Sequence, residues 1–266
     1  MYETSYQKPG SVAEAASLFS SADDGAFLAG GHTLIPTLKQ RLAAPSALID
    51  ISKLDELKGI SEEGDALVVG AAETHANVSA SDVAQKSIGA LACLAAGIGD
   101  PHVRNRGTIG GSVANNDPAA DYPSAVLGLG ATVHTNSRTI AADDFFTGMF
   151  DTALNEGEII TKISFPVPEK AAYAKFDNPA SRYAMAGVFV SKMKDGSVRV
   201  AVTGAGQGGV FRSADMEAAL ASDFSSSALD GISVAADDMI SDMHGSAEYR
   251  ANLVKVMAKR AVDAAS

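Results

Sequence analysis

The sequence predicts an α+β protein with two structural regions. Short apolar runs of strand length are interspersed with segments that have the 3.6-residue apolar spacing of helices. Their order is a mixture and lacks the regular strand–helix alternation of a doubly wound parallel sheet. Pro166 and Pro168 follow a strand-like run and suit a linker, because proline ends a strand. We therefore expect one region over residues 1–168 and a second over residues 169–266.

The first region is expected to carry short helices and strands. The helix over residues 11–20 is well defined by apolar spacing, since Val12, Ala15 and Phe19 share one face. Further helices are predicted at residues 34–42, 87–98 and 122–129. Strands are predicted at residues 25–29, 47–51, 66–71, 131–135 and 159–165.

The second region is expected to be a small sheet followed by helices. Strand-like runs at residues 184–192 and 198–203 flank Asp195 and Gly196, a pair typical of a tight antiparallel hairpin. Another strand is predicted at residues 172–176, and helices at residues 215–221, 226–236 and 248–264.

Composition excludes several classes of protein. The 266 residues include 21 basic and 32 acidic side chains, giving a net charge of −11, which disfavours nucleic-acid binding. The single cysteine, Cys93, can form neither an internal disulfide nor an iron–sulfur cluster. It lies in a predicted apolar helix, so we expect an inert core residue. With no signal peptide and no stretch of membrane-spanning length, a soluble cytoplasmic protein without an integral membrane segment is expected.

Two glycine-rich segments are candidates for holding phosphate groups. Gly30 and Gly31 separate a predicted strand from a predicted helix, so their backbone can adopt positive φ and let a ligand approach. Free N–H groups in such a turn attract anions. A plain strand–turn–helix connection explains the two glycines equally well. The second segment contains Gly110 and Gly111 among hydroxyl and amide side chains. Together the two turns could cradle the two phosphates of a dinucleotide.

Charged residues flank the second glycine pair. Arg104 and Arg106 precede it and could offset phosphate charge. Asp117 precedes Pro118, which is typical of a helix N-cap followed by proline at the first helical position. Asp121 then falls one turn into the predicted helix. There it could bond a ligand hydroxyl, or simply favour the positive end of the helix dipole.

Other patterns for catalysis are weak. Residues 204–209 satisfy G-x-G-x-x-G, but no helix follows directly, so a tight glycine loop is expected instead of a Rossmann site. There is no G-x-S-x-G segment, and the five histidines lack metal-ligand spacing. We therefore predict neither a nucleophile nor a metal site.

Two motifs together resemble the flavin motifs of the molybdenum hydroxylase family. They are Ala29-Gly30-Gly31-His32-Thr33 followed by Leu-Ile-Pro, and Arg104-Asn-Arg-Gly-Thr-Ile-Gly-Gly111 followed by Asn-Asp-Pro. The chain is most similar to the FAD-binding medium subunits of the xanthine dehydrogenase and aerobic carbon monoxide dehydrogenase type. The resemblance covers residues 6–260, including residues 70–75 and 241–250.

The resemblance implies a fold for each region. Residues 1–168 would form a two-part FAD-binding domain of the vanillyl-alcohol oxidase and p-cresol methylhydroxylase type. Residues 169–266 would form the C-terminal domain of the carbon monoxide dehydrogenase flavoprotein, with a three-stranded antiparallel sheet and helices.

The resemblance also implies roles for particular residues. The pyrophosphate and neighbouring ribose would be wrapped by Leu28, Ala29, Gly30, Gly31, His32, Thr33, Leu34 and Ile35. The diphosphate and ribityl region would be held by Thr108, Ile109, Gly110, Gly111 and Ser112. Asp121 would bond a cofactor hydroxyl, and Ile98, Ile160 and Lys175 would contact FAD. Tyr183 would lie near the isoalloxazine ring. Ser112 stands where many relatives have asparagine, which weakens one polar contact.

The resemblance finally implies partners. In this family a large molybdenum subunit oxidises the substrate, a small [2Fe–2S] subunit relays electrons, and the FAD subunit passes them to an external acceptor. Molybdopterin and the clusters would belong to those partners, in a dimer of heterotrimers. The alternatives are a stand-alone flavoprotein oxidase or dehydrogenase of the same fold, a flavin-free scaffold and a nicotinamide-dependent Rossmann enzyme.

Overall fold

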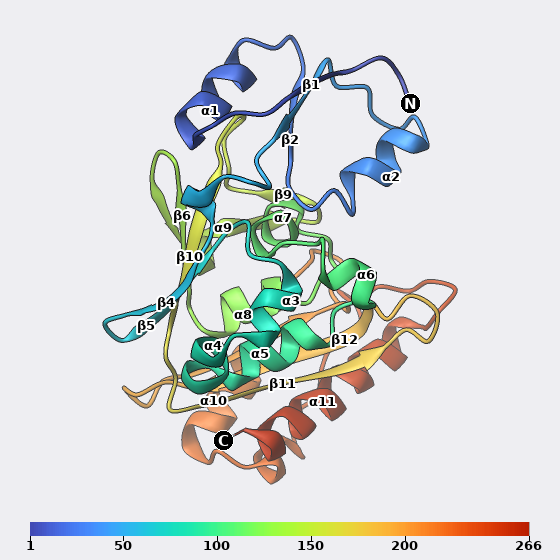
Figure 1. The fold of residues 1–266 in the computed structure, drawn as a ribbon. Coiled ribbons are helices and arrows are strands. Elements are labelled where there is room, and N and C mark those ends of the chain that lie inside the picture. The colour runs from blue at the N-terminus through green and yellow to red at the C-terminus, as the bar shows by residue number, and fades with distance from the viewer. Residues whose placement is uncertain (266) are drawn as a thin grey trace.

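The computed structural model describes residues 1–265 and has the predicted α+β architecture (Figure 1). The first region divides into two units, each with its own sheet. In the N-terminal unit, β1 and β2 both pair in parallel with β3. The elements of this unit are β1 (Ser5–Gln7), α1 (Val12–Ser20), β2 (Gly25–Leu28), α2 (Leu34–Lys39) and β3 (Ala47–Asp50).

The second unit is built on a five-stranded antiparallel sheet with the order β4-β5-β10-β6-β7. Strand β10 lies at its centre and pairs with both β5 and β6. The strands are β4 (Ile60–Glu63), β5 (Ala66–Gly70), β6 (Thr132–Thr135), β7 (Thr139–Ala141) and β10 (Ile160–Pro166). The helices are η1 (Asp55–Leu57), α3 (His75–Ala80), α4 (Asp82–Ser87), α5 (Gly89–Ala96), α6 (Pro101–Arg104), α7 (Ile109–Asn115), α8 (Tyr122–Gly128) and α9 (Ala142–Phe145). A hairpin of β8 (Phe146–Gly148) and β9 (Asp151–Thr152) completes the unit.

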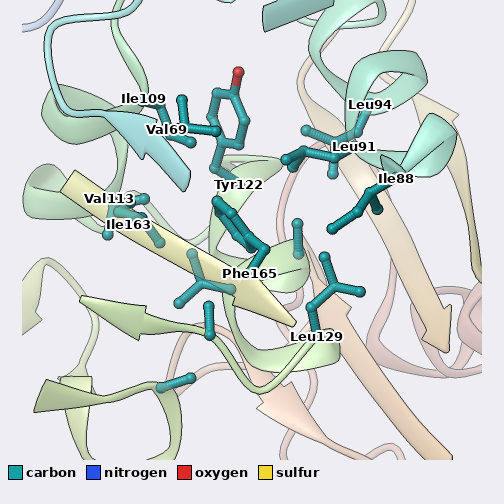
Figure 2. Packing of buried hydrophobic residues seen from close by; sticks show 14 of the residues in the cluster. Val69, Ile88, Leu91, Leu94, Ile109, Val113, Tyr122, Leu129, Ile163 and Phe165 are labelled. Atoms are coloured by element: carbon teal, nitrogen blue, oxygen red, sulfur yellow. The ribbon is translucent and has the colours of Figure 1, made fainter. Parts of the chain in front are cut away.

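The main core lies between this sheet and its helices. Figure 2 shows Ile163 and Phe165 of β10 among apolar side chains from several helices. Leu91 of α5, Ile109 of α7 and Tyr122 of α8 are fully buried in the same cluster. Burial of this apolar surface is the main stabilising term and holds α7 and α8 against the sheet.

The second region is a four-stranded antiparallel sheet covered by helices. Its elements are β11 (Lys170–Asp177), β12 (Ala184–Lys192), β13 (Val198–Thr203), β14 (Phe211–Arg212), α10 (Ala214–Ser222), η2 (Ser226–Leu229) and α11 (Ala247–Ala264). Successive side chains of β12 alternate between two cores, as expected for a strand covered on both faces. Phe189 joins the core of the first region, whereas Val188 and Val190 face α11. Figure 1 shows the sheet between α5 and α8 on one side and α11 on the other.

The structure corrects four local predictions. The helix predicted over 226–236 is only the short η2, because Ser225 bonds Asp223 and Ser227 in a local turn and Gly231 follows. The helices predicted over 34–42 and 87–98 are shorter, at Leu34–Lys39 and Gly89–Ala96. Cys93 is exposed on α5 and is not a core residue.

The prediction of an N-cap at Asp117 is also wrong. The Asp117 carboxylate accepts the N–H of Ala119 in a turn, and the next helix begins only at Tyr122. Asp121 is therefore the residue that precedes α8, not a residue one turn inside it. Its side chain makes no capping bond and is free for other contacts.

No helix within residues 1–265 has the length and apolar character needed to cross a membrane. Over the same residues, no three His, Cys, Asp or Glu side chains gather in a way that could hold a metal ion.

Candidate functional site

A cavity of about 580 Å³ lies where the two units of the first region meet the second region. Its walls come from the turn after β2, from the segment around α7, from β10 and from the loop before β12. Cavities of roughly 300–1,000 Å³ with mostly apolar walls are typical of cofactor sites. Apolar walls are provided by Phe27, Ile51, Leu57, Ala72, Ile98, Val103, Leu154, Ile159 and Ile160.

Fourteen of the eighteen residues predicted for the site line this cavity. They are Ala29, Gly30, Gly31, His32, Thr33, Leu34, Ile98, Thr108, Gly110, Gly111, Ser112, Asp121, Ile160 and Tyr183. The other four are Leu28, Ile35, Ile109 and Lys175. The side chains of Leu28 and Ile35 lie within 3.2 Å of where a Cβ atom at Gly31 would be, and Ile109 is fully buried in the core.

The first glycine turn presents unpaired backbone amides. Gly31 has a φ of +75°, which favours glycine and curls the chain after β2. The N–H groups from Gly30 to Leu34 have no acceptor among the hydrogen bonds of the described residues. Successive N–H groups around a concave turn form an anion-binding nest. This turn is therefore suited to a phosphate group.

The second glycine turn is different, because its amides are already paired. The N–H groups of Ile109 and Gly110 donate to the carbonyl oxygens of Glu73 and Ala71, at 3.0 and 2.9 Å. The N–H of Gly111 donates to Thr108 Oγ1 at 3.2 Å. This turn can therefore offer a ligand hydroxyl side chains and a smooth glycine surface, but not a row of free amides.

Two of the glycines serve contacts within the protein. A Cβ atom at Gly30 would lie 2.1 Å from the carbonyl oxygen of Arg106, and one at Gly110 would lie 2.6 Å from Cβ of Ala71. Both distances are far below van der Waals contact. The absence of a side chain at Gly30 lets the first turn approach the segment before α7, and its absence at Gly110 lets α7 approach the residue that follows β5.

The two arginines before the second turn do not line the cavity. Arg104 instead donates to the carbonyl oxygens of Ile98 and Gly99, at 3.0 Å each, and so fixes the turn before α6. The cation that does line the cavity is Arg182, in the loop before β12.

Asp121 is a buried carboxylate at the cavity wall. It is only 4% exposed, and burial raises the pKa of its carboxyl group. Tyr173 Oη donates to Asp121 Oδ1 at 2.6 Å, and Lys175 Nζ lies 3.1 Å from the same oxygen. Lys175 also donates to the carbonyl oxygens of Gly97 and Arg182. Lys175 thus joins three segments of the cavity wall while lying outside the cavity lining.

Tyr183 lies at the cavity and is 51% exposed. Burial of part of its ring, together with the nearby carboxylates of Asp117 and Asp121, raises the pKa of its hydroxyl. A half-exposed aromatic ring at a cavity edge can cover a planar ligand without closing the site to solvent.

His75 lines the cavity and was not among the residues predicted to bind the cofactor. It is 4% exposed, its Nδ1 atom has no partner among the described residues, and its ring lies 5.3 Å from that of Tyr122. Burial, with His32 and Arg104 nearby, lowers the pKa of His75 to about 4, so the ring is neutral at pH 7.

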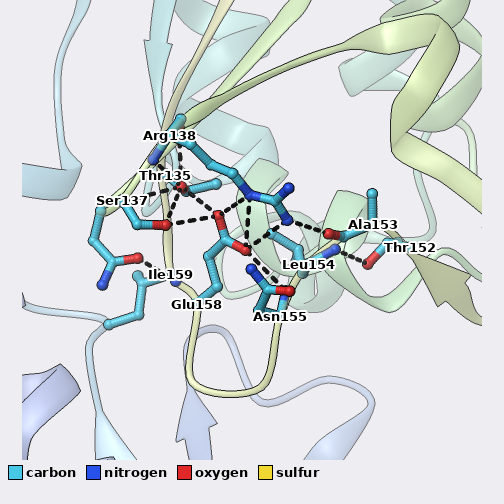
Figure 3. A network of polar contacts seen from close by, with 10 residues as sticks. Thr135, Ser137, Arg138, Thr152, Ala153, Leu154, Asn155, Glu158 and Ile159 are labelled. Carbon is cyan, nitrogen blue, oxygen red and sulfur yellow. Dashed lines mark hydrogen bonds and ion pairs between the residues drawn. The ribbon is translucent and has the colours of Figure 1, made fainter.

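Glu158 also lines the cavity and anchors a polar network at its edge (Figure 3). Its carboxylate accepts from Arg138 Nε and Nη2 at 3.0 Å each, from Thr135 Oγ1 at 2.6 Å and from the N–H of Asn155 at 2.8 Å. These bonds, above all those from Arg138, lower the pKa of Glu158 to about 2. No local sequence motif marks Glu158, since its hydrogen-bond partners come from separate segments of the chain.

Residues 204–209 form a glycine loop, as predicted. Gly204 and Gly209 have φ values of +82° and +94°, and the loop leads from β13 into β14 instead of a helix. The N–H of Gly204 donates to the carbonyl oxygen of Pro118 at 2.8 Å, so the loop supports the segment before Asp121.

An apolar cavity with a nest of unpaired amides at one wall and a buried carboxylate at another defines a protein that binds a nucleotide cofactor. Residues 2–168 match the model of the FAD binding domain in molybdopterin dehydrogenase. The chain belongs to this family, and FAD is its cofactor.

Relatives match along nearly the whole chain. The nicotine 6-hydroxylase medium subunit of Paenarthrobacter nicotinovorans is 37% identical and aligns over 97% of this chain and 95% of its own. The carbon monoxide dehydrogenase medium chain of Hydrogenophaga pseudoflava is 35% identical and aligns over 98% of this chain and 96% of its own. The structure of carbon monoxide dehydrogenase from the latter organism superposes with a TM-score of 0.89 and 35% identity, covering 98% of this chain and 96% of that chain. The structure of quinoline 2-oxidoreductase from Pseudomonas putida 86 superposes with a TM-score of 0.84 and 28% sequence identity. The match covers 98% of this chain and 96% of that chain.

Proposed function

We propose that this chain is the FAD-carrying electron-transfer subunit of a molybdenum-containing hydroxylase or dehydrogenase. It takes electrons from a small [2Fe–2S] subunit and passes them to an external acceptor, while a large molybdenum subunit oxidises the substrate. The complex is a dimer of heterotrimers. Residues 1–168 form the FAD-binding domain and residues 169–266 the C-terminal domain. The names of the relatives, which are medium subunits or medium chains, support this assignment.

The observation that carries the proposal is the nest of unpaired amides from Gly30 to Leu34 at the wall of an apolar cavity. A pyrophosphate carries negative charge that these N–H groups can satisfy without a lysine or arginine in the nest. The apolar walls would then bury the planar ring, and Thr108 and Ser112, which line the cavity, would bond the linking chain through their hydroxyls. When bound, FAD accepts single electrons and releases them in pairs. The protein binds and orients it and limits access of water to the ring.

Three flavins test this assignment: FAD carries two phosphates and an adenosine, FMN carries one phosphate, and riboflavin carries none. Apoprotein should bind FAD tightly, FMN more weakly and riboflavin more weakly still, by at least about 100-fold relative to FAD, because charge-assisted bonds to the phosphates are lost. Flavin fluorescence titration measures the three dissociation constants. Equal affinity for riboflavin and FAD would show that the amide nest holds no phosphate, and failure to bind FAD after reconstitution would refute the function.

The proposed partners are tested on the native complex. Purification through a tag on this chain should yield iron, acid-labile sulfide and molybdenum in constant ratio to FAD. FAD alone, at the mass of the single chain and with its own substrate oxidation, would instead identify a stand-alone flavoprotein.

A further inference from the structure

One oxygen of the buried Asp121 carboxylate is left without a protein partner. Both contacts from the second region reach Oδ1: Tyr173 Oη at 2.6 Å and Lys175 Nζ at 3.1 Å. Oδ2 accepts no hydrogen bond within the described residues, and it is not among the fully enclosed unpartnered atoms. Since Asp121 lines the cavity, Oδ2 is the oxygen that opens onto it. A buried carboxylate oxygen without a donor favours a ligand that supplies one.

We propose that Tyr173 is a positioning residue of the cofactor site, whose hydroxyl holds Asp121 Oδ1 and thereby directs Oδ2 at a hydroxyl or N–H donor of the bound flavin. This inference rests on the proposed function, because it names a residue that acts on the same site. Tyr173 itself does not line the cavity and acts only through Asp121.

The surrounding sheet is shaped to bring the Tyr173 hydroxyl to this point. A Cβ atom at Gly187 would lie 2.3 Å from Tyr173 Oη, so glycine in β12 leaves the space that the hydroxyl occupies. The Tyr173 ring lies beside Phe189 with centroids 6.3 Å apart. On the neighbouring strand β13, Thr203 Oγ1 donates to the carbonyl oxygen of Ala120 at 2.6 Å. Three strands of the second region therefore fix the position of Asp121 in the first region.

A tyrosine donor also favours the ionised form of Asp121. Burial raises the pKa of the Asp121 carboxyl, and the charge of Lys175 and the hydrogen bond from Tyr173 partly offset this rise. The other titratable groups that face Asp121 are Asp177 on β11, Tyr122 in α8 and Tyr183 before β12. Without the tyrosine hydroxyl, Asp121 will take up a proton at higher pH.

The test is a double-mutant cycle on FAD affinity, measured with the full-length apoprotein by fluorescence titration between pH 5 and 9. Tyr173→Phe should weaken FAD binding about tenfold, since a charge-assisted hydrogen bond positions the acceptor. Asp121→Asn should weaken it at least as much. In the double variant, Tyr173→Phe should add nothing to the loss from Asp121→Asn, because the tyrosine acts through the aspartate.

The pH profile separates positioning from a general structural role. The decline of FAD affinity toward acid pH should begin at higher pH in Tyr173→Phe than in the wild type. A merely structural loss would lower affinity equally at every pH. Tyr6→Phe is the matched control, because Tyr6 also donates to a carboxylate, Asp50 Oδ2 at 2.5 Å, but lies outside the cavity lining. It should bind FAD like the wild type.

Each result has a defined meaning. Thermal unfolding of every apoprotein variant checks that the fold is kept. If the effects of Tyr173→Phe and Asp121→Asn add in full, or if Tyr173→Phe keeps the wild-type affinity and pH profile, the positioning role is wrong. Both of these results require wild-type protein that binds FAD. Wild-type apoprotein that does not bind FAD would refute the proposed function itself.

Discussion

Gly30 and Arg106 touch through their backbones, and this contact joins the two glycine turns. A Cβ atom at Gly30 would lie 2.1 Å from the carbonyl oxygen of Arg106. The first turn can therefore reach the segment before α7 only if residue 30 has no side chain. Glycine at position 30 is thus required by the packing of the protein as much as by ligand binding.

Gly30→Ala should destabilise the protein by about 3 kcal/mol, because the added methyl group overlaps backbone that cannot easily move. FAD binding should be lost with it, since the amide nest shifts. Urea unfolding measures the change. Gly89→Ala is the control: a Cβ at this first residue of α5 meets nothing within 4 Å, and a gain of about 0.5 kcal/mol is expected. Equal stability of the two variants would contradict the close contact.

We expect Glu158 to contribute to the stability of the protein in a pH-dependent way. Its pKa is lowered to about 2 in the folded protein from the ordinary value of 4.5. The stabilisation is therefore complete above about pH 4.5 and lost as pH falls toward 2. Glu158→Gln should lower the free energy of unfolding at pH 7 by about 1 kcal/mol, a small value because solvent screens the network.

At acid pH, Glu158→Gln should change the free energy of unfolding little. The difference between wild type and Glu158→Gln should shrink steadily from pH 4.5 to pH 2, as followed by urea unfolding at each pH. Glu62→Gln is a control outside this network, and its effect should be near zero at pH 7. A difference for Glu158→Gln that stays constant with pH would show that the carboxylate is not selectively stabilised in its ionised form.

We expect His75 to make the stability of the protein depend on pH as well. Stability again falls toward acid pH, but over a higher pH range than for Glu158. Its folded pKa of about 4 lies below the ordinary 6.5, so the unfolded chain binds a proton more readily. Stability is complete above pH 6.5 and falls between pH 6.5 and 4, by up to about 3 kcal/mol. His75→Leu should remove this slope. His102→Gln, at an exposed position, should keep it. An unchanged slope in His75→Leu would assign the titration to another group.

Cys93 should react as a surface thiol. It is exposed on α5, so Ellman's reagent should modify one thiol per chain in native buffer, without denaturant. Cys93→Ser should show no reaction and unchanged stability, because no packing is lost. Reaction only after denaturation would restore the expectation of a buried core residue.

Local sequence determined the class of fold and the segments of the site. Three kinds of local signal extend over only a few residues each, so they could be recognised without the structure. They are the glycine pairs between a strand and a helix, the strand-length apolar runs and the Asp195-Gly196 turn. The antiparallel sheet of the second region is confirmed, with β14 as an additional short strand. Both glycine turns lie at one cavity.

Tertiary structure alone decided what each group in the site can do. Both turns contain glycine pairs, yet only the first keeps free amides, because Glu73 and Ala71 accept the N–H groups of the second. Asp121 meets Tyr173, which lies 52 residues away in the sequence. Such contacts depend on how separate sheets pack, and apolar periodicity in the local sequence does not specify which residues of two sheets meet.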